Sequence, residues 1–218
     1  MEASELRLRE ELIEVCRAMN RLGISRGTSG NVSVRHGSGL LISPTGIAYD
    51  ALRPEHVVQL DWEGSSAGDI LPSSEWRFHR DILAARPDLD AIVHTHSVHA
   101  TALAIMGRDI PAIHYMIAAA GGPDIRCAPY ATFGTQELAD AALQALEGRR
   151  ACLLAHHGVI AGHRSMARAL SLAVTVEELA QQYLLCLPHG EPPVLDGEEV
   201  ARVIEKFATY GQQPRRGS

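Results

Sequence analysis

The chain has 218 residues, of which 46% are hydrophobic and 21% charged, and this composition is that of a globular rather than a disordered protein. Its formal net charge of −6, with both signs interspersed, leaves no basic surface for nucleic acid. Apolar stretches end well before the roughly 20 residues of a membrane-spanning helix, and the charged N-terminus lacks the apolar segment of a secretory signal. We therefore expect a cytoplasmic protein whose partners include neither nucleic acid nor membrane.

The first half of the chain predicts helices mixed with a hairpin. Residues 4–22 place apolar side chains at helical spacing, and a glycine follows them. A period-2 segment at 31–35, a Gly-Ser-Gly turn and an apolar segment at 40–42 predict a β-hairpin, and a short strand is expected at 57–60. Two serines at 73 and 74 are candidate N-caps for a helix over 75–85, which places Glu75 in the first helical turn.

The second half alternates the same kinds of element. Strands are expected at 91–93, 151–155 and 159–161, and helices at 98–106, 136–146, 165–187 and 198–210. No fixed repeat occurs, and no linker is long enough to separate two cores. We therefore predict one α/β domain over residues 1–218, with three α-β-α layers, a mainly antiparallel central sheet and a flexible tail at about 212–218.

The four cysteines are widely spaced, form no C-x-x-C pair and mostly lie among apolar neighbours. Free cysteine is among the most often buried residues, and disulfides are rare in reducing compartments. We therefore expect buried thiols rather than disulfides or a thiolate metal site.

Histidine placement predicts a metal site. In a strand, residues i and i+2 point to the same side, so His94 and His96 aim at one point. A third histidine comes from the pair at 156–157, after another strand, where Gly158 lets the backbone turn sharply. Three imidazoles and a carboxylate would form a tetrahedral site for zinc at roughly 2.0–2.2 Å, and the metal would then act as a Lewis acid. Spacing alone does not decide which member of the pair binds.

Glu75 offers the carboxylate, although a glutamate at the start of a helix equally serves as a surface charge that stabilises the helix dipole. The histidines at 79, 99, 114 and 163 have no comparable spacing, and we expect them on the surface or in the core. Lys206 is the only lysine and lies on the last predicted helix, where a solvated role is expected. Because a Schiff-base mechanism would need that residue, carbanion chemistry in this chain calls for a metal.

Three short segments, at 27–31, 43–46 and 73–74, combine glycine with small hydroxyl or amide side chains. Each alone is typical of a turn, but together they suit the oxygens of a phosphate group. The first lacks the G-K-[ST] of a P-loop, and no G-x-G-x-x-G follows a strand, so nucleotide binding is not supported.

Eight ordered segments, spread over nearly the whole chain, resemble the class II aldolase family, and its members that act on L-fuculose 1-phosphate match most closely. The segments are Gly27-Thr-Ser-Gly-Asn-Val-Ser-Val34, Ser43-Pro-Thr-Gly46, Leu71-Pro-Ser-Ser-Glu-Trp-Arg-Phe-His79, His94-Thr-His96, Ile113-His-Tyr-Met-Ile-Ala-Ala-Ala-Gly-Gly122, Ala128-Pro-Tyr-Ala-Thr-Phe-Gly134, His156-His-Gly158 and Lys206-Phe-Ala-Thr-Tyr210.

The resemblance implies a homotetramer whose active sites lie between neighbouring subunits, with one Zn²⁺ per subunit. The implied zinc ligands are His94, His96, His157 and Glu75, which favours His157 over its neighbour. Residues matching the phosphate site are Gly30, Asn31, Thr45, Gly46, Ser73 and Ser74. Residues matching aromatic groups of the site are Tyr115 and Tyr210, which reach it across the interface, and Phe133 and Phe207, which form its wall.

The implied reaction is reversible cleavage of a ketose 1-phosphate to dihydroxyacetone phosphate and a small aldehyde. With L-fuculose 1-phosphate, a substrate of fucose metabolism, the aldehyde is lactaldehyde. Zinc would stabilise the enediolate, Glu75 would leave the metal to exchange the proton at the carbanion carbon, and Tyr115 would serve the aldehyde oxygen. The preferred aldehyde and the physiological metal stay open.

Three alternatives share parts of this pattern. A pentulose-5-phosphate 4-epimerase uses the same fold and metal triad, but typically has an aspartate at the position of Glu75. A sugar-phosphate dehydratase is a second enzyme of the same kind. A non-catalytic zinc-binding assembly would need neither the phosphate segments nor the aromatic wall.

Overall fold

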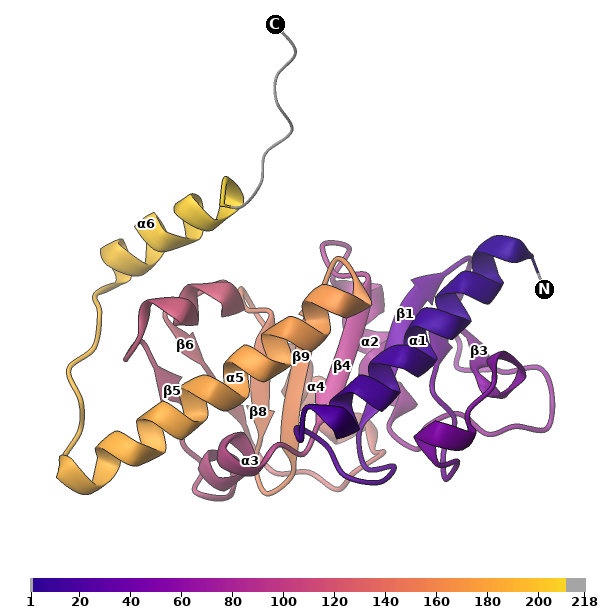
Figure 1. The fold of residues 1–218 in the computed structure, drawn as a ribbon, viewed down its shortest axis with the longest axis horizontal. Helices are drawn as coiled ribbons and strands as arrows, with labels where there is room; N and C mark the ends of the chain where they lie inside the picture. Colours follow the sequence, from indigo (N-terminus) through magenta and orange to yellow (C-terminus); the bar gives the residue numbers. More distant parts are fainter. Residues whose placement is uncertain (1, 211–218) are drawn as a thin grey trace, which may run out of the picture.

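The computed structural model describes residues 2–210 and shows a seven-stranded sheet between two layers of helices (Figure 1). The strand order is β3-β2-β1-β4-β9-β8-β7, and only the β7–β8 pair is parallel. The expected three-layer fold with a mainly antiparallel sheet is confirmed, while the expected tail at 212–218 lies outside the described residues. The strands are β1 (Asn31–His36), β2 (Gly39–Ile42), β3 (Val58–Asp61), β4 (Ala91–Thr95), β7 (Cys127–Ala128), β8 (Ala151–Leu154) and β9 (Gly158–His163).

Helices cover both faces of the sheet. One face carries α1 (Ala3–Arg21), α3 (Val98–Ile105) and α5 (Met166–Cys186), and the other carries α2 (Trp76–Ala85) and α4 (Gln136–Ala145). The remaining helix, α6 (Gly197–Ala208), stands apart at the end of an extended segment and contacts η3 (Tyr115–Ala120) (Figure 1). Shorter elements are η1 (Tyr49–Ala51), η2 (Pro54–His56), η4 (Leu187–His189) and a two-stranded sheet of β5 (Ile110–Pro111) and β6 (Asp124–Ile125).

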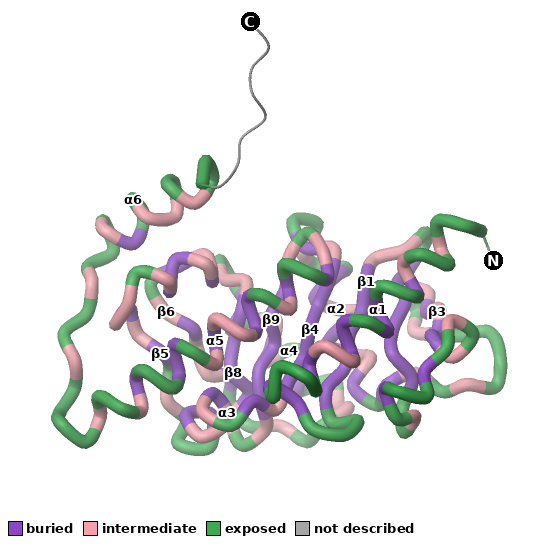
Figure 2. Tube along the Cα trace, viewed as in Figure 1, coloured by how far each residue is buried: buried purple, intermediate pink, exposed green. Residues whose placement is uncertain are grey.

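The sheet separates two apolar cores, and its strands form the buried centre of the molecule (Figure 2). Successive strand residues face opposite sides, so Val93 packs in the core under α5 while Ile92 packs in the core under α2. The same alternation on β1 places Val32 under α5. By parity, Asn31 and His94 face α2, and they are register partners on adjacent strands.

The predicted helices and strands are present, with ends that differ by one or two residues. One difference concerns the site: the first helical residue of α2 is Trp76, so Glu75 is its N-cap and not part of its first turn. Ser73 Oγ accepts a hydrogen bond from the Glu75 backbone N–H at 3.3 Å. No element was predicted for 110–128, because two-residue strands and a single 3₁₀ helix are too short to show periodicity.

No helix among residues 2–210 combines the length and apolarity that membrane crossing requires. The four cysteines are free, as expected. Cys16 and Cys152 are buried, Cys127 is half-buried, and Cys186 is exposed, so the expected burial is wrong for Cys186, which ends α5.

Candidate active site

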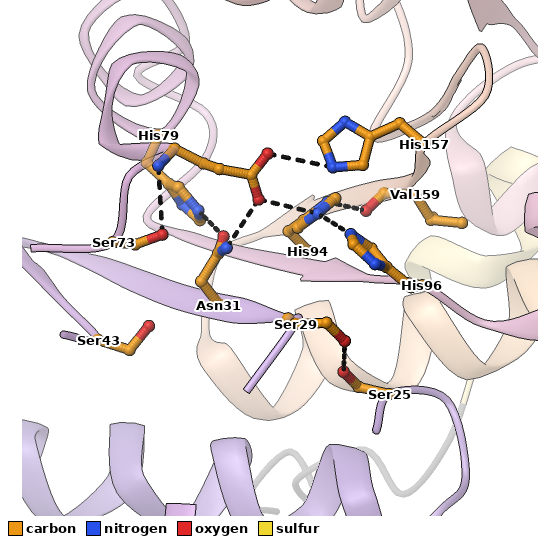
Figure 3. Close-up of polar contacts among 12 residues, drawn as sticks. Ser25, Ser29, Asn31, Ser43, Ser73, His79, His94, His96, His157 and Val159 are labelled. Carbon is orange, nitrogen blue, oxygen red and sulfur yellow. Dashed lines mark hydrogen bonds and ion pairs between the residues drawn. The ribbon is translucent and has the colours of Figure 1, made fainter. Parts of the chain in front are cut away.

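Three histidine rings and one carboxylate converge at the C-terminal end of β4, on the face of the sheet that α2 covers (Figure 3). The Nε2 atoms of His94 and His96 lie 2.9 Å apart, and each oxygen of Glu75 lies 3.1 Å from a ring nitrogen, Oε2 from His94 and Oε1 from His157. All four ligand atoms lie within 4.8 Å of one another. The predicted H-x-H arm and carboxylate therefore meet, and His157 rather than its neighbour completes the group.

The backbone around the third histidine explains this choice. His156 has a φ of 56°, the left-handed conformation that non-glycine residues seldom adopt, and the chain turns there before His157. At Gly158, an added Cβ would lie 2.4 Å from the Thr95 carbonyl oxygen and 2.9 Å from the His96 ring. Only glycine lets β9 approach the end of β4 this closely, and this approach brings the three histidines together.

The four side chains suit a divalent cation. Nδ1 of His94 donates to the Val159 carbonyl at 2.8 Å, which leaves the Nε2 lone pair facing the other ligands. Oε1 of Glu75 is buried and has no hydrogen-bond partner among the described residues. Ligands at roughly 2.0–2.2 Å from one ion stand about 3.3–3.6 Å apart, close to the distances found here. A cation would satisfy all of these groups at once.

The charge states of the carboxylate and of the His96 ring also suit the binding of a metal ion. Burial raises the pKa of Glu75, but His94 and His157 lower it by more and hold it well below its ordinary value, so the carboxylate is ionised. Burial, together with His94 and His157, lowers the pKa of His96 to about 3, so its ring is neutral. A neutral imidazole and an ionised carboxylate are the forms that bind a metal.

A cleft of about 360 Å³ opens beside the histidines, and its lining is polar on one side and aromatic on the other. The polar residues at the cleft come from the three segments that the sequence singled out, with Asn31, Thr45 and Ser73 among them. Tyr130 and Phe133, both largely exposed, supply the aromatic side. The full lining is Thr28, Ser29, Gly30, Asn31, Pro44, Thr45, Ser73, Ser74, Glu75, His96, Tyr130, Ala131, Phe133, His156 and His157.

The sequence also matches the family model described as "Class II Aldolase and Adducin N-terminal domain" over residues 10–184. This match covers most of the chain. The chain belongs to the class II aldolase family.

Two similar relatives of this class II aldolase have names with different substrates. A 5-methylthioribulose-1-phosphate/5-deoxyribulose-1-phosphate aldolase from Rhodospirillum rubrum is 56% identical, over 97% of this chain and 96% of its own. An L-fuculose phosphate aldolase from Escherichia coli is 54% identical, over 94% of this chain and 96% of its own. A solved structure titled L-fuculose 1-phosphate aldolase has a TM-score of 0.91 at 40% identity, covering 95% of this chain and 98% of that one.

Some residues predicted for the site of this aldolase lie elsewhere. Gly46 is not among the residues that line the cleft, although Thr45 beside it is. Tyr115, Phe207 and Tyr210 form a separate aromatic group, with ring centroids 6.3 Å apart for Tyr115 and Phe207 and 6.4 Å for Phe207 and Tyr210. These three residues do not line the cleft within this chain.

Sequence reasoning missed two features of the aldolase site. Tyr130 lines the cleft from a loop, where no periodicity marks it. His79 was expected to be a surface or core residue; it is fully buried, as a core residue is, but its ring bonds to Asn31 beside Glu75 (Figure 3). Burial lowers the pKa of His79 to about 3, so the ring is neutral. Its position four residues after Glu75, at the start of a predicted helix, is the signal that could have found it.

Proposed function

We propose that this aldolase catalyses the reversible cleavage of L-fuculose 1-phosphate to dihydroxyacetone phosphate and L-lactaldehyde, with one Zn²⁺ per subunit. A single observation carries the proposal: a buried carboxylate and three imidazoles meet at a cleft, which Glu75, His96 and His157 line together with segments that carry hydroxyl and amide groups. The first group suits a metal and a proton transfer at carbon, and the second suits a phosphate. The 54% identical L-fuculose phosphate aldolase supports the choice of sugar.

A metal held by Glu75, His94, His96 and His157 would polarise the substrate's ketone oxygen and stabilise the negative charge that develops there. In the cleavage direction, the bond between C3 and C4 breaks as the C4 hydroxyl gives up its proton, and Glu75, once displaced as a ligand and protonated by solvent, would pass that proton to C3. In the synthesis direction, the ionised carboxylate removes that proton. Its burial beside the imidazoles keeps it close to the reacting carbon.

The phosphate is proposed to lie against Gly30, Thr45, Gly46, Ser73 and Ser74, together with Asn31. Most of these residues line the cleft and carry hydroxyl groups or small side chains that expose backbone N–H groups. Phe133, and Phe207 from a neighbouring subunit, would form the wall against the aldehyde portion.

The aldehyde oxygen also needs a proton donor in the synthesis direction, and in cleavage the ionised form of the same group takes that proton back from the C4 hydroxyl. We assign this role to Tyr115 of a neighbouring subunit, with Tyr210 beside it. Both tyrosines are exposed and lie outside the cleft of their own chain, so a homotetramer with shared sites would bring them to it. The four free cysteines support a reducing, cytoplasmic location.

A second candidate is the cleavage of 5-methylthioribulose 1-phosphate or 5-deoxyribulose 1-phosphate. The observation that favours it is the 56% identity to the Rhodospirillum rubrum aldolase of that name. Both candidates use the same phosphate end and release the same dihydroxyacetone phosphate. They differ only in the aldehyde, which the exposed aromatic side of the cleft would receive.

Product analysis with parallel substrates tests the proposal. L-Fuculose 1-phosphate, L-rhamnulose 1-phosphate, 5-methylthioribulose 1-phosphate, 5-deoxyribulose 1-phosphate and L-ribulose 5-phosphate are incubated with zinc-loaded protein, and both products are quantified. The highest kcat/KM is expected for L-fuculose 1-phosphate. A higher value for either 5-substituted ribulose supports the second candidate. Epimerisation of L-ribulose 5-phosphate without release of a three-carbon product contradicts both.

A further inference from the structure

A chain of buried hydrogen bonds leads from β1 through α2 to the carboxylate of the site. Ser33 Oγ lies 2.7 Å from Nδ1 of His79, and Nε2 of the same ring lies 2.5 Å from the Asn31 side-chain oxygen. The Asn31 amide nitrogen then donates to Oε2 of Glu75 at 2.9 Å. All four residues are buried, and His79 is fully so. The proposed reaction uses Glu75, and the proposed phosphate site uses Asn31, whereas Ser33 and His79 have no part in either.

The fold places these residues in one row. Asn31 and Ser33 are two apart on β1, so both side chains face α2. His79 follows Glu75 by four residues, which brings the two side chains onto one face at the start of α2. The His79 ring also stacks on Phe78, with centroids 4.6 Å apart, so packing fixes its plane as well as its hydrogen bonds.

The direction of each hydrogen bond follows from the carboxylate. An ionised carboxylate only accepts, so the Asn31 amide must turn its NH₂ toward Glu75 and its oxygen toward His79. That oxygen also only accepts, so Nε2 of His79 must carry the ring proton. Nδ1 is then an acceptor, and the Ser33 hydroxyl donates to it. A neutral His79 with its proton on Nε2 satisfies every atom in the row.

We propose that His79 is a positioning residue for Glu75: it holds the Asn31 amide in the orientation that donates to Oε2. Oε1 is thereby left free to face His157 and the proposed metal position. The effect on catalysis rests on the proposed function, whereas the effect on metal affinity does not. Residues that orient metal ligands typically change metal affinity or activity by about 10–100-fold when they are replaced.

Loss of the Nε2 donor removes one of the two contacts that orient the Asn31 amide and leaves only the contact with Glu75. The amide oxygen would then be buried without a donor, and rotation of the amide would turn it against the Glu75 carboxylate. Two acceptors face each other in that arrangement, so the carboxylate is displaced. We expect weaker metal binding and a lower kcat, with little change in KM.

Two substitutions of nearly equal polarity separate this role from general packing. In His79→Gln, the amide nitrogen can stand near the position of Nε2 and still donate to Asn31. In His79→Asn, the shorter amide reaches the position of Nδ1 and contacts only Ser33. We expect His79→Asn to lower kcat by about 10–100-fold and weaken zinc affinity about tenfold. For His79→Gln, kcat and zinc affinity should each stay within about threefold of wild type. In both variants, KM should also stay within about threefold of wild type.

A double-mutant cycle tests whether His79 acts through Asn31. In an Asn31→Ala background, His79→Asn should change zinc affinity by less than about twofold, because the amide that it orients is already gone. If His79 served only to support packing, the losses of zinc affinity from the two single substitutions would instead multiply in the double variant. Equal losses in the Gln and Asn variants, or losses that multiply in the cycle, would overturn the proposal.

Zinc affinity is measured by competition with a chromophoric chelator, which requires no substrate. If the zinc affinities of the variants follow the expected order but wild type cleaves no sugar phosphate, the proposed function fails and the positioning role stands. If wild type cleaves its substrate and His79→Asn matches it in kcat and zinc affinity, the positioning role fails alone. Should the variants not fold, ¹⁵N spectra of wild-type His79 decide: a ring proton on Nδ1 overturns the proposal, and one on Nε2 supports it.

Discussion

The two groups of side chains proposed for catalysis have opposite surroundings. Glu75 is 5% exposed and His94 is fully buried; Asn31 on β1 donates to Oε2 of Glu75, and Nδ1 of His94 donates to the Val159 carbonyl on β9. Tyr115 and Tyr210 are 50% and 83% exposed, and they lie on η3 and just beyond α6. The metal-binding half of the proposed site is thus complete within one chain, whereas the tyrosine half stands on a surface.

The buried metal-binding residues and the exposed tyrosines meet two different physical requirements. A site that collects a carboxylate and three imidazoles needs a rigid and nearly dry environment, and the centre of the sheet supplies it. A group that serves a variable aldehyde needs only to reach the substrate, so a surface segment of a second subunit suffices. Of the α6 side chains, Val200 is buried, and Val203, Ile204 and Phe207 are half-buried against the core.

Removal of the metal should have the largest effect, because it disables the buried half entirely. We expect a strong chelator to abolish cleavage and added zinc to restore it. Borohydride, added with substrate, should leave activity unchanged, because no Schiff base forms. Inactivation by borohydride, or full activity of metal-free protein by elemental analysis, would contradict this prediction.

Glu75→Gln should lower turnover nearly as much as removal of the metal does, while the metal content stays close to that of wild type. The three imidazoles still hold the ion, yet an amide cannot take or return the proton at carbon, so kcat should fall by about 10²–10⁴-fold. The measurements are steady-state kinetics and zinc per subunit on the same sample. Near wild-type kcat with full metal would leave Glu75 with a structural role only.

Tyr115→Phe tests the exposed half and should lower kcat by about 10²-fold, with zinc content unchanged. Mixing it with the Glu75→Gln protein, under conditions in which subunits exchange, should regenerate sites that carry both wild-type groups. Activity should then exceed that of either parent. Demonstrated exchange without recovery, or a fully active monomer, would rule out sites shared between subunits.

Lys206→Ala should have the smallest effect. Lys206 lies in the last turn of α6, in an exposed position, and the metal chemistry proposed here makes no use of its amine. We expect kcat and KM within about twofold of wild type, with the substitution costing less than about 0.5 kcal/mol in stability. A loss of activity with intact assembly would require a revised mechanism.

The sequence allowed the fold and the metal-binding residues to be predicted because both follow from short periodicities. Alternation along β4 gave His94 and His96, and helical spacing gave the helices. The choice of His157 came from family resemblance, since the φ of 56° at its neighbour leaves no mark in the sequence. The N-cap position of Glu75 was missed because Ser73 and Ser74 are stronger cap candidates than a glutamate.

The link between His79 and Asn31 could not be found from one segment alone. It depends on how α2 is placed over β1, and this placement is set by packing between residues far apart in the chain. Cleft residues on loops, such as Tyr130, were missed for the same reason. The aromatic group of Tyr115, Phe207 and Tyr210 was named from the resemblance, and its proposed role in a second subunit stays a prediction.

The contact of Gly158 with the end of β4 has a consequence for engineering. The spacing of His157 from the H-x-H pair is fixed there by main-chain atoms, which no side-chain rotamer can adjust. Volume-conserving exchanges in the two apolar cores, at positions away from β4 and β9, are therefore expected to leave the ligand nitrogens in place. At those positions we expect thermostability and metal affinity to change independently of each other.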